Sequence, residues 1–375
     1  MIKYFVYTLL FFSTKCFCQY KVRFVVTDNA MYNATQMFAA GNFNSWNPAD
    51  KNFLLKKTGE NTWQIDIAYM PKGAYSFKFT QGNWQTVEDS LNGAERSNRL
   101  AKIDSDTILY FTILGWRQED KPRNHTASKN VHLISDSFFM PQLNRYRKIH
   151  IYLPSNYKTS KQKFPVLYIH DAQNLFDDFT APFGEWNVDE TLDSLQKQTG
   201  KYCIVVGINH GGEKRLVEYN PYDTKEFGKG EGDAYTDFLV KTLKTFIDKN
   251  YRTKATASST AIAGSSMGGL ISTYAILKYP TVFGTAGIFS PAYWIAPALE
   301  NFAEKIMTKN NNNRFWFYGG GKEGFTMMAD MERMQNIIAK KTNNTSVIKE
   351  ENAKHNEVAW RKNFAAFYLW WIKDF

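Results

Sequence analysis

The sequence predicts an α/β protein in which a small all-β sandwich precedes a mostly parallel, doubly wound sheet. The chain has 375 residues, which is long enough for two domains of about 100–200 residues each. Short alternating strands separated by turns fill residues 19–114, as in a sandwich. From residue 131 onward, apolar strands alternate with helices, which is typical of a parallel sheet covered on both faces.

Residues 1–18 have the features of a secretory signal peptide. Lys3 precedes an apolar run at residues 4–12, and the segment CFC at residues 16–18 suits cleavage after Cys18. The apolar run is too short for a permanent membrane anchor. We therefore expect an exported protein, periplasmic or extracellular, with no stable membrane span.

Charge and cysteine content limit the partners that the chain could have. The net charge of +10 is carried by basic residues that are scattered rather than clustered, so we expect no nucleic-acid partner. Removal of the signal peptide would leave Cys203 as the one remaining cysteine. The mature chain could then form no internal disulfide, and we expect Cys203 to be a small buried residue in a strand.

The front domain is expected to span residues 19–114. Its predicted strands are the segments KVRFVV, TQMFAAGNF, TWQIDIAYM, AYSFKFTQG and DTILYFTIL. Turn residues lie between them, including the Pro-Lys-Gly turn at residues 71–73. Residues 115–130 are polar, contain a proline and show no periodicity, so we interpret them as a linker.

The second domain is expected to span residues 131–375. Its predicted strands are RKIHIYLP, FPVLYIHD, YCIVVGIN, STAIAGS, FGTAGIFS and RFWFYGGG. Its predicted helices are NVDETLDSLQKQTG, DAYTDFLVKTLKTFIDKNY, GGLISTYAILKYP and VAWRKNFAAFYLWWIKDF.

A candidate nucleophile lies in GSSMG, residues 264–268, between an apolar strand and a helix. This is the context of the Gly-x-Ser-x-Gly turn, whose central serine attacks the substrate. The central serine here is Ser266, whereas Ser265 would point back into the scaffold. Glycines on both sides permit a sharp turn, and the helix N-terminus would offer N–H groups to a developing oxyanion.

A candidate base and a candidate acid follow Ser266 in the chain. In α/β-hydrolase order the base comes after the nucleophile, and His355 is the only one of the six histidines that does so. The acid that orients the base should lie at a strand end between the two. Glu323, just after RFWFYGGG, is the expected acid, and Asp330 is the alternative.

Two backbone N–H groups are expected to bind the oxyanion. One belongs to Met267, directly after the expected nucleophile, and the other to Gln173, in the loop after FPVLYIHD. His170 precedes Ser266 in the chain, so we expect it to support this loop rather than to act as the base.

Seven segments carry a family resemblance over most of residues 145–375: YIHDAQNLFD, EWNVDETL, VGINHGGEKRLVEYNP, FIDKNYRT, GSSMGG, GIFSPAYW and HNEVAW. Together they resemble the esterase family that includes enterochelin esterases, feruloyl and acetyl-xylan carbohydrate esterases and the mycolyltransferase antigens. The resemblance implies an α/β-hydrolase fold and a triad of Ser266, His355 and Glu323 that hydrolyses an ester through an acyl-enzyme. The family usually has glycine where this chain has Ala172, which makes that loop less permissive.

Three further segments, AAGNFNSWNP, YSFKFTQGNWQTVED and ERSNR, resemble the glycogen-binding and starch-binding modules, which are immunoglobulin-like β-sandwiches. The resemblance implies that Trp46 and Trp84 stack on sugar rings and that Lys78 hydrogen-bonds to sugar hydroxyls. In the alternative, both tryptophans are core residues of a sandwich that only braces the second domain.

Four functions remain open. The leading hypothesis is a secreted serine esterase that removes feruloyl or acetyl groups from a polysaccharide or oligosaccharide. A siderophore esterase would require cations for its anionic substrate, and Lys214 and Arg215 are the candidates. The others are an acyltransferase and a non-catalytic carbohydrate-binding protein.

No cofactor is expected, and no metal site, because the histidines and cysteines lack ligand spacing. The sequence leaves the oligomeric state open.

Overall fold

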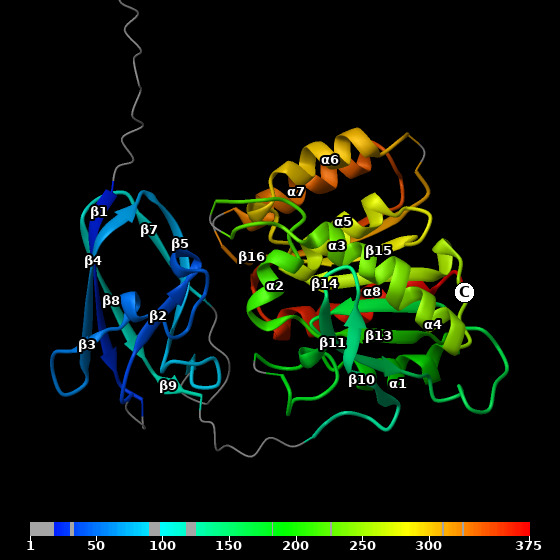
Figure 1. Ribbon diagram of the computed structural model, residues 1–375, viewed down its shortest axis with the longest axis horizontal. Coiled ribbons are helices and arrows are strands. Elements are labelled where there is room, and N and C mark those ends of the chain that lie inside the picture. The colour runs from blue at the N-terminus through cyan, green and yellow to red at the C-terminus, as the bar shows by residue number, and fades with distance from the viewer. Residues whose placement is uncertain are drawn as a thin grey trace, which may run out of the picture. The chain divides into compact units, whose positions relative to one another are not determined.

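The computed structural model describes residues 19–30, 34–89, 98–117, 125–181, 183–225, 227–309, 311–324 and 326–375. The expected signal peptide and residues 118–124 of the expected linker lie outside these ranges. The described chain forms two compact units, one that ends at Arg117 and one that contains residues 125–375. Both units are drawn in Figure 1.

Two sheets enclose the core of the first unit. One sheet has the strand order β3-β4-β1-β8 and the other has the order β2-β5-β7. The rings of Phe24, Phe77, Phe79 and Phe111 pack between them, with centroids 5.1–6.4 Å apart. The strands and short helices are β1 (Gln19–Asp28), β2 (Phe38–Gly41), η1 (Asn42–Asn44), η2 (Lys51–Phe53), β3 (Lys56–Lys57), β4 (Thr62–Pro71), β5 (Gly73–Thr80), β6 (Glu88–Asp89), β7 (Arg99–Ile103), β8 (Thr107–Ile113) and β9 (Gly115–Trp116).

The first unit extends slightly beyond the expected sandwich. Strand β9 pairs with β6, and the side chain of Trp116 is buried in the core of this unit. Its indole N–H donates to both carboxylate oxygens of Asp28, at 3.1 and 3.0 Å. Residues 115 and 116, expected at the start of the linker, are therefore part of the sandwich.

An eight-stranded sheet forms the centre of the second unit (Figure 1). Its order is β10-β11-β13-β12-β14-β15-β16-β17. The β10–β11 and β11–β13 pairs are antiparallel, and the remaining pairs are parallel. The strands are β10 (Val131–Met140), β11 (Arg145–Tyr152), β12 (Val166–His170), β13 (Ile204–Ile208), β14 (Thr260–Ser265), β15 (Thr285–Phe289), β16 (Arg314–Lys322) and β17 (Thr345–Lys354).

Helices cover both faces of this sheet. One face shares a buried core with α1 and α8, and the opposite face shares one with α3, η5, α4, α5, α6 and α7. The mostly parallel, doubly wound architecture expected from the sequence is thus confirmed. The helices are η3 (Ala172–Asn174), α1 (Val188–Thr199), η4 (Gly212–Lys214), α2 (Arg215–Glu218), α3 (Gly232–Asp237), η5 (Phe238–Lys244), α4 (Thr245–Asn250), η6 (Ala257–Ser259), α5 (Met267–Lys278), η7 (Tyr293–Ile295), α6 (Ala298–Ile306), α7 (Met327–Ala339) and α8 (Glu357–Ile372).

The two edge strands of the sheet, β10 and β17, are absent from the sequence-based prediction. Most of their side chains are partly or fully exposed, so neither strand has the apolar run that marks the central strands. The single long helix expected at residues 233–251 is also subdivided, because a π-helical segment, η5, lies between α3 and α4.

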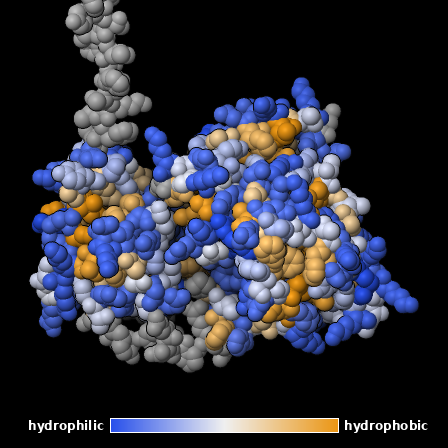
Figure 2. All heavy atoms as spheres, viewed as in Figure 1, coloured by the Kyte–Doolittle hydropathy of each residue, from blue (hydrophilic) through white to orange (hydrophobic). Residues whose placement is uncertain are grey.

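Every helix in the described part of the chain is too short or too polar to cross a bilayer. On the face shown in Figure 2, hydrophilic side chains predominate, and apolar side chains form separate groups among them. Cys203 is buried directly before β13, and burial raises the pKa of its thiol. Its expected burial is confirmed.

Candidate active site

Ser266 lies at the bend between β14 and α5. Its backbone angles are φ 57° and ψ −118°, which a residue with a side chain adopts only at a cost of about 1–3 kcal/mol. The bend is fixed by hydrogen bonds. The N–H of Ser266 donates to Phe289 O at 2.9 Å, and its carbonyl accepts from Ala292 N at 3.0 Å. Ser266 is partly exposed, whereas Ser265, the last residue of β14, is buried.

The glycines around Ser266 allow β14 and α5 to approach each other closely. A Cβ atom on Gly264 would lie only 2.8 Å from the carbonyl carbon of Gly268. Any side chain there would push the strand and the helix apart. The GSSMG segment therefore has the strand–turn–helix geometry expected from its sequence.

His355 lies between the end of β17 and the start of α8. Asn356 caps α8 by accepting a hydrogen bond from Ala359 N at 3.1 Å. The Nδ1 atom of His355 lies 3.5 Å from Glu323 Oε2. The Trp360 ring lies perpendicular to the imidazole, with the two ring centroids 4.9 Å apart. With Nδ1 directed at the carboxylate, Nε2 is the nitrogen left to accept a proton.

Glu323 is held in place by hydrogen bonds to its other oxygen. Oε1 accepts from the hydroxyl of Ser290 at 2.6 Å and from Gly320 N at 2.8 Å. Ser290 in turn accepts from the indole N–H of Trp360 at 2.8 Å. Ser290 and Trp360 are thus supporting residues that the sequence analysis missed. Ser290 directly follows β15, and its position at a strand end was the signal that could have identified it.

The alternative acid, Asp330, faces different groups. Its carboxylate accepts from the Arg333 guanidinium at 2.5 Å and from Thr326 Oγ1 at 2.9 Å. The structure therefore places Glu323, and not Asp330, beside His355.

The expected oxyanion residues lie on neighbouring segments. Met267 is the first residue of α5, and Gln173 lies on η3, directly after β12. A Cβ atom on Gly268 would lie 3.3 Å from both Asp171 Oδ2 and His170 Cβ, so the start of α5 packs against the end of β12. Gln173 is anchored at both ends, because its carbonyl accepts from Thr180 Oγ1 at 2.8 Å and its Oε1 accepts from His210 N at 3.3 Å.

His170 is a buried support behind this loop. Its Nδ1 atom lies 3.0 Å from the hydroxyl of Tyr235, and its ring packs against Tyr219. Burial lowers the pKa of His170 to about 4, so the ring is neutral near pH 7. This position agrees with the expected supporting role.

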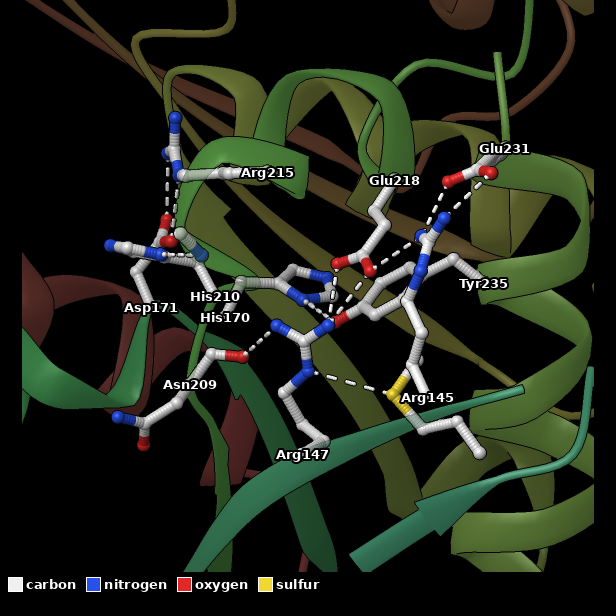
Figure 3. Close-up of polar contacts among 12 residues, drawn as sticks. Arg145, Arg147, His170, Asp171, Asn209, His210, Arg215, Glu218, Glu231 and Tyr235 are labelled. Carbon is white, nitrogen blue, oxygen red and sulfur yellow. Dashed lines mark hydrogen bonds and ion pairs between the residues drawn. The ribbon is translucent and has the colours of Figure 1, made fainter. Parts of the chain in front are cut away.

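The charged residues drawn with His170 in Figure 3 are paired with one another. Arg147 donates to both oxygens of Glu218, at 2.8 and 2.7 Å, and Arg145 bridges Glu218 and Glu231. Arg215, a candidate cation for an anionic substrate, is instead paired with Asp171 at 2.8 Å through two parallel hydrogen bonds. The other candidate cation, Lys214, is exposed.

Trp294 and Phe227 form an aromatic pair that includes the η7 segment after β15. Trp294, on η7, follows the Ala292 that donates to the Ser266 carbonyl, and 37% of its surface is exposed. Its ring packs edge-on against Phe227 at a centroid distance of 6.2 Å.

Three carboxylates at the start of α1 have a spacing that could hold a metal ion. They belong to Glu185, Asp189 and Glu190, and one oxygen from each lies within 4.8 Å of the others. Burial raises the pKa of Glu185 to about 7, and burial together with Asp189 raises the pKa of Glu190 to about 8. The sequence analysis considered histidine and cysteine spacing and did not consider this group.

The predicted sugar-binding residues lie in the first unit. The rings of Trp46 and Trp84 are partly exposed and adjacent, with centroids 6.2 Å apart and planes inclined by 41°. Lys78, on β5, has only 4% of its surface exposed. The two tryptophans are thus brought together, whereas Lys78 is buried.

Among solved structures, the chain is similar to the enterobactin esterase FES from Shigella flexneri, crystallised in the presence of enterobactin. The TM-score is 0.55 at 15% identity, and the match covers 95% of this chain and 94% of the other. At this identity the likeness shows the fold alone.

Curated relatives that match in sequence include a protein of Bacillus subtilis and an enzyme of Xylanibacter ruminicola. The uncharacterized protein YbbA of Bacillus subtilis is 32% identical over 207 residues, which is 52% of this chain and 75% of YbbA. An endo-1,4-beta-xylanase/feruloyl esterase of Xylanibacter ruminicola is 27% identical over 164 residues, 41% of this chain and 21% of that enzyme.

The family model described as "Putative esterase" matches residues 141–370. The match spans more than half of the chain and includes Ser266, Glu323 and His355. With the α/β-hydrolase architecture of the second unit, it establishes that the chain belongs to this esterase family.

Proposed function

We propose that this protein is a secreted serine carboxylic-ester hydrolase that acts through an acyl-enzyme and removes feruloyl or acetyl groups from a polysaccharide or oligosaccharide. The observation that carries the proposal is that one short segment, residues 290–292, contacts two parts of the site. Ser290 binds the carboxylate of Glu323, and Ala292 N–H binds the carbonyl of Ser266.

The reaction would begin with attack of Ser266 Oγ on the ester carbonyl carbon. His355 Nε2 would take the hydroxyl proton, while Glu323 holds the other ring nitrogen and stabilises the imidazolium. The N–H groups of Met267 and Gln173 would bind the oxyanion. His355 would then give its proton to the departing alcohol, which leaves the acyl group on Ser266.

Water would complete the cycle by the same route. His355 would take a proton from a water molecule as it attacks the acyl-enzyme, and would return that proton to Ser266 as the carboxylic acid departs. Net consumption is one ester and one water. An acyltransferase would differ only in that a sugar hydroxyl replaces this water.

Two features support an acylated carbohydrate as the substrate. Trp294 has an exposed ring that packs against Phe227, and it lies two residues after Ala292, which donates to the Ser266 carbonyl. An aromatic side chain at this position would suit the flat ring of a feruloyl group. Trp46 and Trp84 offer adjacent, partly exposed rings on the first unit, which suit the apolar face of a sugar. The relative from Xylanibacter ruminicola is named as a feruloyl esterase.

A siderophore esterase is the second candidate, because the structural likeness to the enterobactin esterase covers 95% of the chain. Its anionic substrate would need free cations beside the nucleophile. The ion pair with Asp171 occupies Arg215 and leaves Lys214 as the remaining cation of the two. This argument favours the carbohydrate ester.

A substrate panel on the purified protein tests the proposal. We expect release of ferulate or acetate from feruloylated or acetylated xylan, little hydrolysis of ferric enterobactin, and loss of activity in Ser266→Ala. Faster hydrolysis of ferric enterobactin than of either xylan would replace the first candidate with the second. If neither the xylans nor ferric enterobactin were hydrolysed, but acyl groups were transferred to an added sugar, the protein would be an acyltransferase.

A further inference from the structure

Asp171 has an unusual position for a charged residue. It follows β12 and directly precedes the η3 turn that carries Gln173. Its backbone is left-handed, with φ 60° and ψ 46°, a conformation that residues with a side chain rarely adopt. Only 6% of its surface is exposed. A buried carboxylate on a left-handed backbone therefore begins the loop proposed to bind the oxyanion.

The carboxylate of Asp171 also lies next to the start of α5. A Cβ atom on Gly268 would be 3.3 Å from Asp171 Oδ2, and Gly268 follows Met267, the other proposed oxyanion donor. A negative charge at this point opposes the formation of a second negative charge on the oxyanion. The site would therefore work against its own transition state if this carboxylate were left uncompensated.

Arg215 supplies the compensation. Its Nε and Nη2 atoms donate to the two oxygens of Asp171, both at 2.8 Å (Figure 3). The guanidinium packs over the ring of Tyr219 at 5.1 Å. Burial alone would raise the pKa of Asp171, but the pairing with Arg215 outweighs it and holds that pKa below its ordinary value. The pair thus remains charged and fixed in orientation.

We propose that Arg215 is a positioning residue for the esterase reaction, which fixes the left-handed bend at Asp171 so that Gln173 N–H faces the oxyanion and cancels the charge of Asp171 beside Met267. The inference rests on the proposed function. It assigns to this arginine a role in the chemical step in place of substrate binding.

The same network contains a matched control. Arg145 forms a similar bidentate pair with Glu231, at 2.5 and 2.9 Å. Its side chain is 26% exposed, against 23% for Arg215. Arg145 also donates to Glu218 at 3.0 Å, but among the described residues no hydrogen bond or ion pair joins it to Asp171 or to the η3 turn. Loss of either arginine should therefore affect folding similarly, but only loss of Arg215 should affect the oxyanion loop.

The test compares Arg215→Met, Arg215→Lys and Arg145→Met with the parent, using p-nitrophenyl acetate hydrolysis and inhibition by phenylboronic acid, whose serine adduct is a tetrahedral anion. We expect kcat/KM and boronate affinity to fall by about 10²-fold in Arg215→Met, as when one oxyanion donor is lost. Arg145→Met should change neither greatly. Arg215→Lys should lose less activity than Arg215→Met, because lysine keeps the positive charge but cannot form the two parallel hydrogen bonds to Asp171.

A double variant distinguishes the effect of the unpaired Asp171 charge from a general loss of folding. In Arg215→Met/Asp171→Asn the uncompensated carboxylate is gone, and asparagine tolerates the left-handed bend. We expect this double variant to be at least about tenfold more active than Arg215→Met, since an unpaired buried charge is the main cost. Equal activity of the two, or equal losses in Arg215→Met and Arg145→Met, would overturn the inference.

Amide hydrogen exchange at residues 172–174 tests the positioning role of Arg215 without relying on esterase activity. Exchange there should be faster in Arg215→Met than in Arg145→Met, whether or not the parent hydrolyses esters. An inactive parent in which Arg215→Met selectively loosens this turn would contradict the esterase proposal and leave the positioning role in place. Unchanged exchange in Arg215→Met would overturn that role.

Discussion

At the scale of single residues, the site depends on the geometry of Ser266 and on the support of Glu323. The bend at Ser266 is strained but is held by Phe289, Ala292 and the glycines around it. Glu323 is oriented by Ser290, which Trp360 orients in turn. Glu323 Oε2 faces His355, and hydrogen bonds to Oε1 hold the carboxylate in this orientation.

Replacement of Ser290 tests this support. In Ser290→Ala, Glu323 Oε1 keeps Gly320 N–H but loses the hydroxyl donor, so the carboxylate should face His355 less well. We expect kcat to fall by about tenfold, a loss of roughly 1.4 kcal/mol in transition-state stabilisation, measured with p-nitrophenyl acetate. The control is Asp330→Asn, which removes a buried carboxylate that does not contact His355. A larger loss in Asp330→Asn than in Ser290→Ala would contradict the assignment of Glu323.

The sequence points to candidate catalytic residues but not to the residues that contact them. Ser266, His355 and Glu323 stand out because chain order and strand ends restrict the choice. The pairing of Arg215 with Asp171 could not be predicted, because the two residues are 44 positions apart and no local pattern encodes such a contact. The contacts of Ser290 with Glu323 and with Trp360 are likewise long-range, because they join residues 33 and 70 positions apart.

At the scale of elements, burial explains which parts of the fold could be predicted. The central strands β12, β13, β14 and β15 are buried throughout and read as apolar runs. The edge strands β10 and β17 lack this signal because most of their side chains are partly or fully exposed. Their pairing depends on the neighbouring strand, which a local pattern does not contain.

The start of α1 gives a prediction on pH. Glu185 accepts from Thr126 Oγ1 at 2.9 Å, and burial raises its pKa to about 7, whereas an unfolded glutamate titrates near pH 4.3. Between these values the folded state holds a proton that the unfolded state has released. The free energy of unfolding should therefore fall as pH rises through this window, by at most about 1.4 kcal/mol per pH unit.

The measurement is urea unfolding between pH 4.5 and 8 in the parent and in Glu185→Gln. The variant cannot lose the proton, so its stability should decline less steeply, although Glu190 would retain part of the slope. Glu213→Gln, which changes an exposed glutamate, should follow the parent. Parallel curves for the parent and Glu185→Gln would show that this carboxyl is ionised in the folded protein across the window.

At the scale of the whole molecule, the chain joins two compact units with separate cores. The esterase family match covers the second unit. Sugar binding by the first unit remains a prediction that rests on Trp46 and Trp84. Because each unit has its own core, substitutions at these tryptophans should leave the second unit folded.

Binding to insoluble xylan or starch tests the first unit. We expect retention of the parent and loss of retention in Trp46→Ala and Trp84→Ala, because each ring would contribute stacking area that alanine lacks. Tyr110→Ala, which removes another exposed aromatic ring of the same unit, is the matched control and should bind like the parent. If the parent protein were retained on neither glycan, the sugar-binding prediction would be wrong, and the alternative role of the first unit, as a support for the second, would be favoured.

The most direct test of the account is the site of covalent labelling by a fluorophosphonate, which reacts with an activated serine. We predict a single adduct, located by mass spectrometry of the proteolysed protein on Ser266. Labelling should persist in Ser265→Ala, slow strongly in His355→Ala and vanish in Ser266→Ala. An adduct on Ser265 or on another residue, or equal labelling of Ser266→Ala and the parent, would contradict the claim that Ser266 is the nucleophile.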